Sequence, residues 1–254
     1  MAAFQENLVV FTCSFYGSLE DVRFKVCLEF LSLAKAQGVR VVVVDASPDA
    51  AVREAMVSAG AFRVEKQTAK GKKGAALREA LALASGVASG DDCWLCWQEP
   101  EKADMARHWA NVAAESDGIK GLEVVVPARE VKLFEATYPI EQFHSESFAN
   151  AYCNLAMRES MGTGQEPLDW HFGPFGLKKR HAHLWLANDG ELWDAQVLPI
   201  VHALKNGLAV GGVEVPFIAP LAMKAQEEGI FVFVEKRLMQ INFLDPKVVA
   251  AFKA

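Results

Sequence analysis

At 254 residues the chain is long enough to bury a sizeable core, as one large domain or two small ones. The formal net charge of −6 and the scattered lysines and arginines argue against a nucleic-acid-binding protein held by phosphate contacts. The five cysteines lack the spacing of a zinc site or a disulfide framework, and no apolar run reaches the length of a membrane span. We therefore expect a cytoplasmic protein with a small polar ligand, no nucleic-acid partner and no membrane span.

Strand and helix signals alternate along the first half of the chain. A β-branched and aromatic run at 8–12 predicts a strand, and apolar residues at helical spacing follow it up to Gly38. The almost continuous β-branched run 39–44 predicts a parallel strand buried on both faces. The remaining signals predict strands at 61–64, 93–97 and 122–126 and helices at 74–85 and 101–115. This alternation predicts an α/β fold with a mostly parallel central sheet flanked by helices.

The second half has a different pattern. Residues 130–157 are predicted to be helical, with an interruption at Tyr138-Pro139, and 162–176 is predicted to be a loop rich in aromatic residues and glycine. A helix at 193–205 and strands at 213–218 and 230–234 complete the prediction. We divide the chain at about residue 128 into a ligand-binding half, 1–128, and a second half, 129–254, within one continuous domain.

Polar residues follow three of the predicted parallel strands. They are 12–14 after the first strand, Asp45 after the second, and Glu99 and Glu101 after the strand at 93–97. Parallel sheets bind ligands beyond the carboxyl ends of their strands, so these side chains are expected on one rim. Carboxylates at such a place suit Mg²⁺ or Mn²⁺, which take one or two of them together with phosphate oxygens. The alternative is that Glu101 favours the start of the next helix electrostatically and Glu99 is solvated.

A basic loop precedes the helix at 74–85. Lys72 and Lys73 stand between Gly71 and Gly74, where ammonium groups and helix N-terminal N–H groups can neutralise phosphates. The alternative is a solvated surface loop.

Four short motifs occur in the order typical of one family. They are VVFTCSF at 9–15, VVDAS at 43–47, GKKGAAL at 71–77, and an acid-x-acid pair, Glu99 and Glu101, after the strand that follows Ala84-Ser85-Gly86. This segment resembles nucleotide-sugar glycosyltransferases of the GT-A fold, especially family 2, in which a "PTYN"-like turn, "VDDGS", "GKGxAL" and "DxD" hold these places. The resemblance covers roughly residues 8–128.

The resemblance implies that a nucleotide-diphosphate sugar lies across the strand ends, with residues 129–254 on the acceptor side. Thr12, Ser14 and Asp45 would contact the base and ribose, and Lys72 or Lys73 the base or phosphates. Glu99 and Glu101 would hold Mn²⁺ or Mg²⁺. A further metal ligand, which some GT-A enzymes supply from their second half, would be His202.

Three carboxylates are candidates for the catalytic base. An inverting transfer needs a carboxylate near the acceptor hydroxyl. Asp169, which adjoins Trp170 and Phe172, is the first candidate, and Glu191 and Asp194 are the second. The alternative for Asp169 is a cap or turn residue.

We therefore expect a metal-dependent hexosyltransferase that uses a nucleotide-diphosphate sugar and a small or soluble glycan acceptor. One rival is a sugar nucleotidyltransferase, although residues 13–18 lack the Gly-rich, Arg-containing loop that those enzymes use. Another is a non-catalytic nucleotide-sugar-binding protein, because glutamates replace the usual aspartates and Ala46 replaces the second aspartate of "VDDGS".

Overall fold

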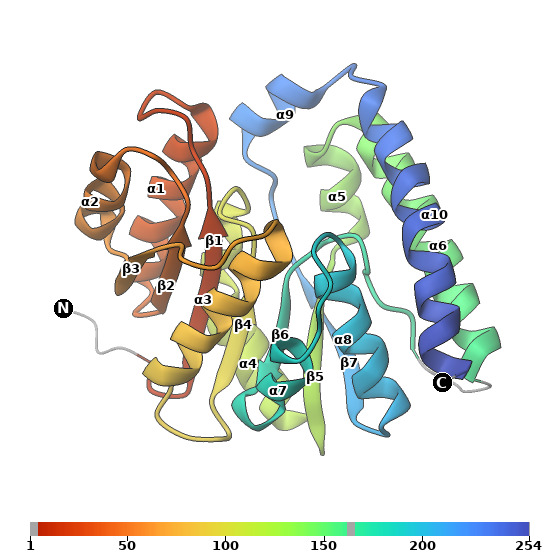
Figure 1. The fold of residues 1–254 in the computed structure, drawn as a ribbon. Coiled ribbons are helices and arrows are strands. Elements are labelled where there is room, and N and C mark those ends of the chain that lie inside the picture. The colour runs from red at the N-terminus through yellow and green to blue at the C-terminus, as the bar shows by residue number, and fades with distance from the viewer. Residues whose placement is uncertain (1–4, 162–165, 254) are drawn as a thin grey trace.

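The computed structural model describes residues 5–161 and 166–253. The strands within these residues form one seven-stranded sheet (Figure 1). The strand order is β3-β2-β1-β4-β6-β5-β7. Strand β6 is antiparallel to β4 and β5, and the other pairs are parallel. The strands are β1 (Leu8–Ser14), β2 (Arg40–Asp45), β3 (Arg63–Lys66), β4 (Trp94–Trp97), β5 (Leu122–Arg129), β6 (Phe175–Lys178) and β7 (Ala209–Val215).

Helices follow most of the strands and cover both faces of the sheet. They are α1 (Val22–Ala36), α2 (Ala50–Ala59), α3 (Lys73–Val87), α4 (Trp109–Gly118), α5 (Val131–Thr137), α6 (Ile140–Met161), α7 (Ala182–Leu186), α8 (Asp194–Lys205), α9 (Leu221–Glu227) and α10 (Val232–Lys253), with 3₁₀ turns η1 (Ala103–Arg107) and η2 (Lys179–His181).

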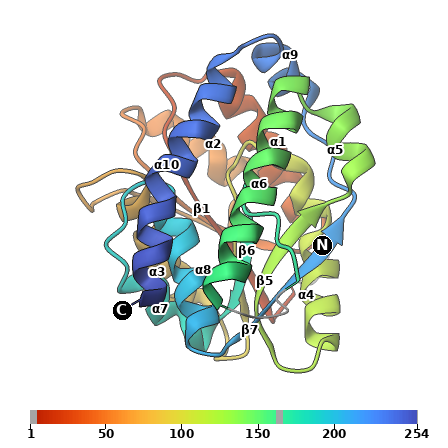
Figure 2. The same ribbon diagram turned by 90° about the vertical axis from the view of Figure 1, so that its right-hand side faces the viewer.

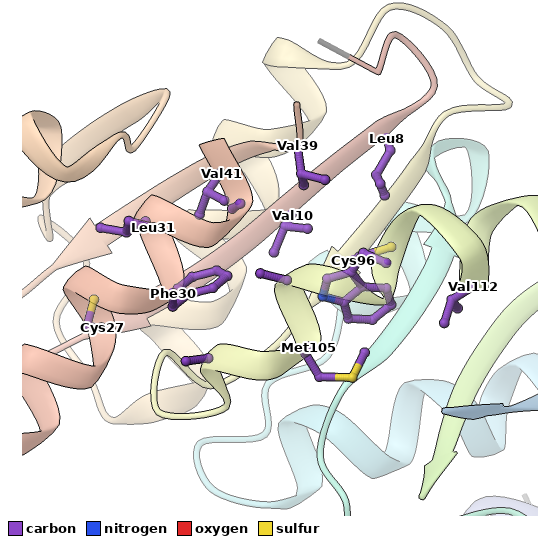
Figure 3. Packing of buried hydrophobic residues seen from close by; sticks show 14 of the residues in the cluster. Leu8, Val10, Cys27, Phe30, Leu31, Val39, Val41, Cys96, Met105 and Val112 are labelled. Atoms are coloured by element: carbon purple, nitrogen blue, oxygen red, sulfur yellow. The ribbon is translucent and has the colours of Figure 1, made fainter. Parts of the chain in front are cut away.

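The core divides into two layers because successive strand residues point to opposite faces. Val10 and Val41 pack with α1, η1 and α4 in one layer (Figure 3). Val9, Val42 and Val44 pack with α3, α7 and α8 in the other. The central strands are buried on both faces, which explains their continuous β-branched sequence and confirms the predicted α/β class.

Two long helices form a wall beside the sheet. Figure 2 shows α6 and α10 next to each other, and the contacts of α10 with α6 and α8 join this wall to the rest of the molecule. None of the helices among residues 5–161 and 166–253 combines the length and apolar character needed to cross a membrane.

Several predictions for the second half need correction. The strand predicted at 230–234 is wrong, because Val232 begins helix α10, whose residues 233, 237, 240, 241, 244 and 248 line one cavity at helical spacing. The strand predicted at 213–218 lies earlier, at β7, and strand β6 falls inside the predicted loop 162–176. Residues 162–165 of that loop lie outside the described residues.

Two predicted helices are interrupted. The helix predicted at 101–115 is divided into η1 and α4 at His108. The one at 130–157 is divided into α5 and α6 at Tyr138-Pro139, the predicted interruption, because proline cannot donate the backbone bond that would continue α5.

The topology gathers several loops at one rim. The parallel strands β1, β2, β4 and β5 end there, and the antiparallel β6 begins there. The segment 169–174 before β6 therefore lies beside residues 98–102 after β4. Strands from both halves of the chain share the sheet, while the division of function at residue 128 stays a prediction.

Candidate active site

A cavity of about 560 Å³ lies between the carboxyl ends of the strands and the α6–α10 wall. Its charged side is formed by residues that follow β4 and by the first residue of α3: Lys73, Glu99, Glu101 and Lys102. Much of the opposite lining is aromatic, including Tyr138, Trp170, Trp193, Phe217 and Phe233. A cavity with an apolar wall and a few convergent charged groups is the usual form of a small-molecule site.

Glu99 is the centre of the charged side. Its Oε1 accepts a hydrogen bond of 2.9 Å from Lys73 Nζ, and its Oε2 lies 3.3 Å from Lys102 Nζ. Gln196, in the first turn of α8, also donates to Oε1, at 3.3 Å. Burial alone would raise the pKa of Glu99, but the charges of Lys102 and Lys73 hold the pKa of this carboxyl well below its usual value. Glu99 is therefore an anion at neutral pH.

The close approach of Gly173 fixes the position of the Glu99 carboxylate. Gly173 has a φ of +99°, and a Cβ at this position would lie 2.7 Å from Glu99 Oε2. Glycine satisfies both the backbone conformation and the space. The loop before β6 thus packs directly against the residue that follows β4.

Glu101 lies on the same side of the cavity and binds Arg23. The Nε and Nη2 atoms of Arg23 both donate to Oε1, at 2.9 and 2.7 Å. No hydrogen bond from the described residues reaches Glu101 Oε2. One carboxylate oxygen of Glu101 is therefore free for a further partner.

The donor set fits a hard divalent cation. Glu99 Oε2 is buried and has no hydrogen-bond partner among the described residues, although Lys102 Nζ lies 3.3 Å away. Glu101 contributes a second oxygen, Oε2, that accepts no hydrogen bond from those residues. The described residues contain no cluster of three or more His, Cys, Asp or Glu side chains suited to a metal. Two carboxylates completed by phosphate oxygens and water are, however, the normal environment of protein-bound Mg²⁺.

The residues after β1 and β2 brace the rim. Thr12 is buried and its Oγ1 donates to the carbonyl oxygen of Gln98 at 2.7 Å. Asp45 is also buried, and its oxygens accept from Ser14 Oγ at 2.8 Å, from Ser47 Oγ at 2.7 Å and from Arg53 Nη1 at 3.0 Å. None of these side chains lines the cavity. Their contacts with a nucleoside stay a prediction.

Lys72 and Glu191 belong to a second, smaller depression. The backbone N–H of Lys72, the N-cap of α3, donates to Glu191 Oε2 at 2.6 Å, and Arg78 binds Glu191 Oε1. Asp194 lines the same depression, where it accepts from the N–H of Leu192 at 2.9 Å and pairs with Lys247. Among the three candidate bases, Glu191 and Asp194 therefore lie outside the main cavity.

Asp169 lines the main cavity but is fully engaged. Its Oδ2 accepts from the backbone N–H and the Nε of Arg129, and its Oδ1 accepts from Arg129 Nη2 and from Asn150. Burial opposes ionisation, yet the charge and hydrogen bonds of Arg129 lower the pKa of Asp169. In this structure Asp169 anchors the end of β5 to the loop before β6.

His202 lies in the last turn of α8, beyond the part of that helix that lines the cavity. Gln196, Val197 and Ile200 of the same helix do line it. The structure thus brings Lys73, Glu99, Glu101 and Asp169 together and leaves His202 apart from them.

Sequence analysis missed many polar residues of the cavity, among them Lys102, Gln196, Glu227 and Lys236. The position of Lys102 directly after Glu101 could have identified it as a site residue. The other three come from distant helices. Glu227 Oε2 accepts from Gln142 Nε2 at 2.6 Å, and no described cation lies within 4 Å of this carboxylate. Burial raises the pKa of Glu227 above its usual value, against the opposing effects of Gln142, Lys102 and Lys236.

Solved structures identify the architecture. A structure of glucosyl-3-phosphoglycerate synthase from Mycobacterium tuberculosis with phosphoglyceric acid has a TM-score of 0.57 at 14% identity, over 97% of this chain and 79% of that chain. The chain has the GT-A fold. The complex of the same synthase with Mn²⁺, UDP and glucosyl-3-phosphoglycerate has a TM-score of 0.54 at 14% identity, over 91% and 80% of the two chains.

A third complex of that synthase, with Mn²⁺ and UDP-glucose, has a TM-score of 0.55 at 14% identity, over 83% of this chain and 70% of that chain. No protein-family model and no curated protein sequence matches this chain. The GT-A fold predicted from four short motifs is confirmed by structure.

Proposed function

We propose that this protein is a metal-dependent glycosyltransferase that moves a sugar from a nucleotide-diphosphate sugar to a small acceptor. One observation carries the proposal. Two carboxylates, Glu99 and Glu101, and two lysines, Lys73 and Lys102, line one cavity of about 560 Å³ at the rim of a GT-A sheet, and both lysines contact Glu99. The complexes of the structural neighbour with Mn²⁺, UDP and UDP-glucose support this choice of ligands.

In the proposed complex, Glu99 and Glu101 would hold Mn²⁺ or Mg²⁺. The metal, when bound, neutralises charge on the diphosphate as the bond to the sugar breaks. Lys73 and Lys102 place two further positive charges beside the same leaving group, where electrostatic stabilisation acts on the transition state. We keep Thr12, Ser14 and Asp45 as the proposed contacts of the base and ribose, and Lys72 as a proposed contact of the base or phosphates.

The transfer exchanges one bond for another at the anomeric carbon. The bond from this carbon to the phosphate oxygen breaks, and the nucleoside diphosphate leaves with the electron pair. The acceptor oxygen bonds to the same carbon and loses its proton. Trp193 and Phe233, which both line the cavity, would offer apolar surface to the sugar and help to exclude water.

We propose Glu227 as the group that receives this proton. Asp169 is bound by Arg129 and Asn150, and Glu191 and Asp194 lie outside the main cavity. Glu227 faces the cavity without a cation in direct contact, and Gln142 positions it. A carboxylate with a raised pKa is a better base near neutral pH than an ordinary one.

Glu227→Gln should therefore lower the transfer rate by about a hundredfold or more, the usual range for the loss of a general base. Donor affinity should remain unchanged, because the variant keeps the shape of the side chain. The measurement is turnover of an acceptor that the wild type uses, compared with nucleotide affinity. Glu228→Gln, at the next and exposed residue, is the matched control, and a fully active Glu227→Gln would exclude this role.

The transferase proposal is tested by thermal unfolding with UDP, GDP, CDP and ADP and with their sugar conjugates, each with and without Mn²⁺. We expect one base to stabilise the protein in a Mn²⁺-dependent way, by about 2.7 kcal/mol at a ligand concentration of a hundred times Kd. A folded protein that responds to none of these nucleotides would refute the proposal. Stabilisation by a nucleotide sugar without any turnover would instead favour a non-catalytic binding protein.

A further inference from the structure

Lys236, in the second turn of α10, lines the main cavity and has no carboxylate within 4 Å among the described residues. Its neighbour Arg237 is paired with Glu146 and also donates to Gln240. The nearest aromatic partner of Lys236 is Phe233, whose ring centroid lies 5.9 Å from Nζ. Lys236 is thus a partly buried cation that protein anions do not neutralise by direct contact.

Three other lysines line the same cavity. Lys224 donates to the carbonyl oxygen of Ala136, and the other two share a single anion. Lys73 Nζ lies 2.9 Å from Glu99 Oε1, and Lys102 Nζ lies 3.3 Å from Glu99 Oε2. The three lysines, Lys73, Lys102 and Lys236, with the one carboxylate Glu99 therefore carry a formal charge of +2.

None of the other carboxylates that line the cavity pairs directly with these lysines. Glu101 binds Arg23, Asp169 binds Arg129, and Asp245 accepts from Tyr152. Glu146 already pairs with Arg129 and Arg237. Glu227 accepts a hydrogen bond from Gln142 and forms no ion pair with a described lysine. Burial and then the charges of Arg237, Lys73 and Lys102 lower the pKa of Lys236, so its ammonium is held at an electrostatic cost. A bound anion would remove that cost.

We propose that Lys73, Lys102 and Lys236 form a subsite that binds a phosphoryl group by direct ammonium contacts. The formal charge of +2 matches a phosphoryl dianion better than a carboxylate, which carries one negative charge. The three lysines belong to α3, the segment after β4 and α10, so one anion would join the sheet rim to the α6–α10 wall (Figure 1).

This inference rests on the proposed function for the source of the phosphoryl group, and two sources share the chemistry. One is the diphosphate of the donor, and the other is a phosphate on the acceptor. In either case the lysine ammonium groups contact the phosphoryl group directly and not through a metal. Part of the phosphoryl binding should therefore persist without a divalent metal.

The test is calorimetric titration of the wild type, Lys236→Met and Lys236→Arg in the presence of a chelator. Methionine keeps the apolar stem of lysine and removes the charge, and arginine restores the charge. Pyrophosphate and UDP probe the donor source. Inorganic phosphate, added to protein saturated with the nucleoside diphosphate, probes the acceptor source. Lys132→Met, at an exposed lysine of α5, is the matched control.

We expect Lys236→Met to weaken one of these ligands by about tenfold or more, the usual effect of losing a charge-assisted hydrogen bond. Lys236→Arg should recover most of the affinity. Weaker pyrophosphate and UDP binding would assign the subsite to the donor, and weaker phosphate binding alone would assign it to the acceptor. Unchanged affinity for all three ligands, in a variant with the circular dichroism of the wild type, would overturn the proposal.

The failure of this inference can be told from the failure of the transferase proposal. In one result, the wild type binds pyrophosphate and phosphate through Lys236 and binds no nucleotide, with or without Mn²⁺. This result would support the phosphoryl subsite and refute the transferase proposal. In the opposite result, the wild type binds a nucleotide with Mn²⁺, and Lys236→Met binds every probe as well as the wild type. That result would support the transferase proposal and refute the phosphoryl subsite.

Discussion

Glu99→Gln is expected to abolish the Mn²⁺-dependent part of nucleotide binding and to lower turnover by about a hundredfold or more. A metal contributes several kcal/mol to a transition state in which charge develops on phosphate, and each 1.4 kcal/mol is a factor of about ten in rate. Glutamine removes the charge that we propose as the principal metal ligand. It also leaves Lys73 and Lys102 without their shared anion.

This second effect gives the variant a distinctive signature. With residue 99 neutral, the group formed by it and Lys73, Lys102 and Lys236 has one positive charge more, so pyrophosphate should bind at least as tightly without metal as it does to the wild type. The measurement is nucleotide and pyrophosphate affinity with and without Mn²⁺, beside turnover. Glu65→Gln, at a surface glutamate of β3 paired with Arg63, should change none of these quantities. Retention of the full Mn²⁺ effect in Glu99→Gln would remove Glu99 from the metal site.

Strands were predicted correctly where the local residue pattern matches the burial of the strand in the sheet. The run predicted at 39–44 forms the buried parallel strand β2, Arg40–Asp45, and such a β-branched run has few other stable environments. The pattern failed at 230–234, where the same residue types begin α10. There Ile230, Phe231 and Val232 are exposed, and the later residues of α10 provide the packing against α6 and α8. This long-range packing of the helix overrides a local preference for strand.

The short strand β6 was missed for a related reason. Its four residues, Phe175–Lys178, include a glycine, follow Gly173-Pro174 and precede basic residues, so no strand period is visible. Its place in the sheet is determined by pairing with β4 and β5, which are distant in the chain. Four residues are too few to show whether a strand pairs in the antiparallel or the parallel sense.

The candidate site was predictable where it follows strand ends. Lys73, Glu99 and Glu101 line the cavity because they adjoin α3 and β4, whose order the motifs suggested. Lys236 and Glu227 come from helices at the far end of the chain and carry no motif. Only the folding of the α6–α10 wall over the rim brings them to the cavity.

Arg129→Met is expected to destabilise the protein by about 3–5 kcal/mol, the usual cost of removing one partner of a buried ion pair. Arg129 is buried at the end of β5, and it binds Asp169 at 2.8 Å and Glu146 at 2.6 Å. Methionine would leave Asp169 with the hydrogen bonds of Asn150 and of the backbone N–H of residue 129 but with no cation. The free energy of unfolding in urea measures the effect.

Two comparisons make the prediction specific. Arg63→Met removes a surface ion pair with Glu65 and should cost no more than about 1 kcal/mol. Replacing Asp169 by leucine and Arg129 by methionine together removes the buried charge pair, so the double variant should be more stable than Arg129→Met alone. A loss below about 1 kcal/mol in Arg129→Met would show that water or other side chains replace the arginine.

The pH dependence has a definite sign. Arg129 lowers the folded-state pKa of Asp169, and Arg237 and Arg129 lower that of Glu146, although burial opposes both shifts. A carboxylate with a depressed folded pKa stabilises the fold above its unfolded pKa of about 4, and this contribution is lost as the pH falls toward the folded pKa. The difference in unfolding free energy between the wild type and Arg129→Met should therefore be constant above about pH 5 and decrease below about pH 4. A difference that persists undiminished in acid would mean that the methionine disturbs packing rather than charge.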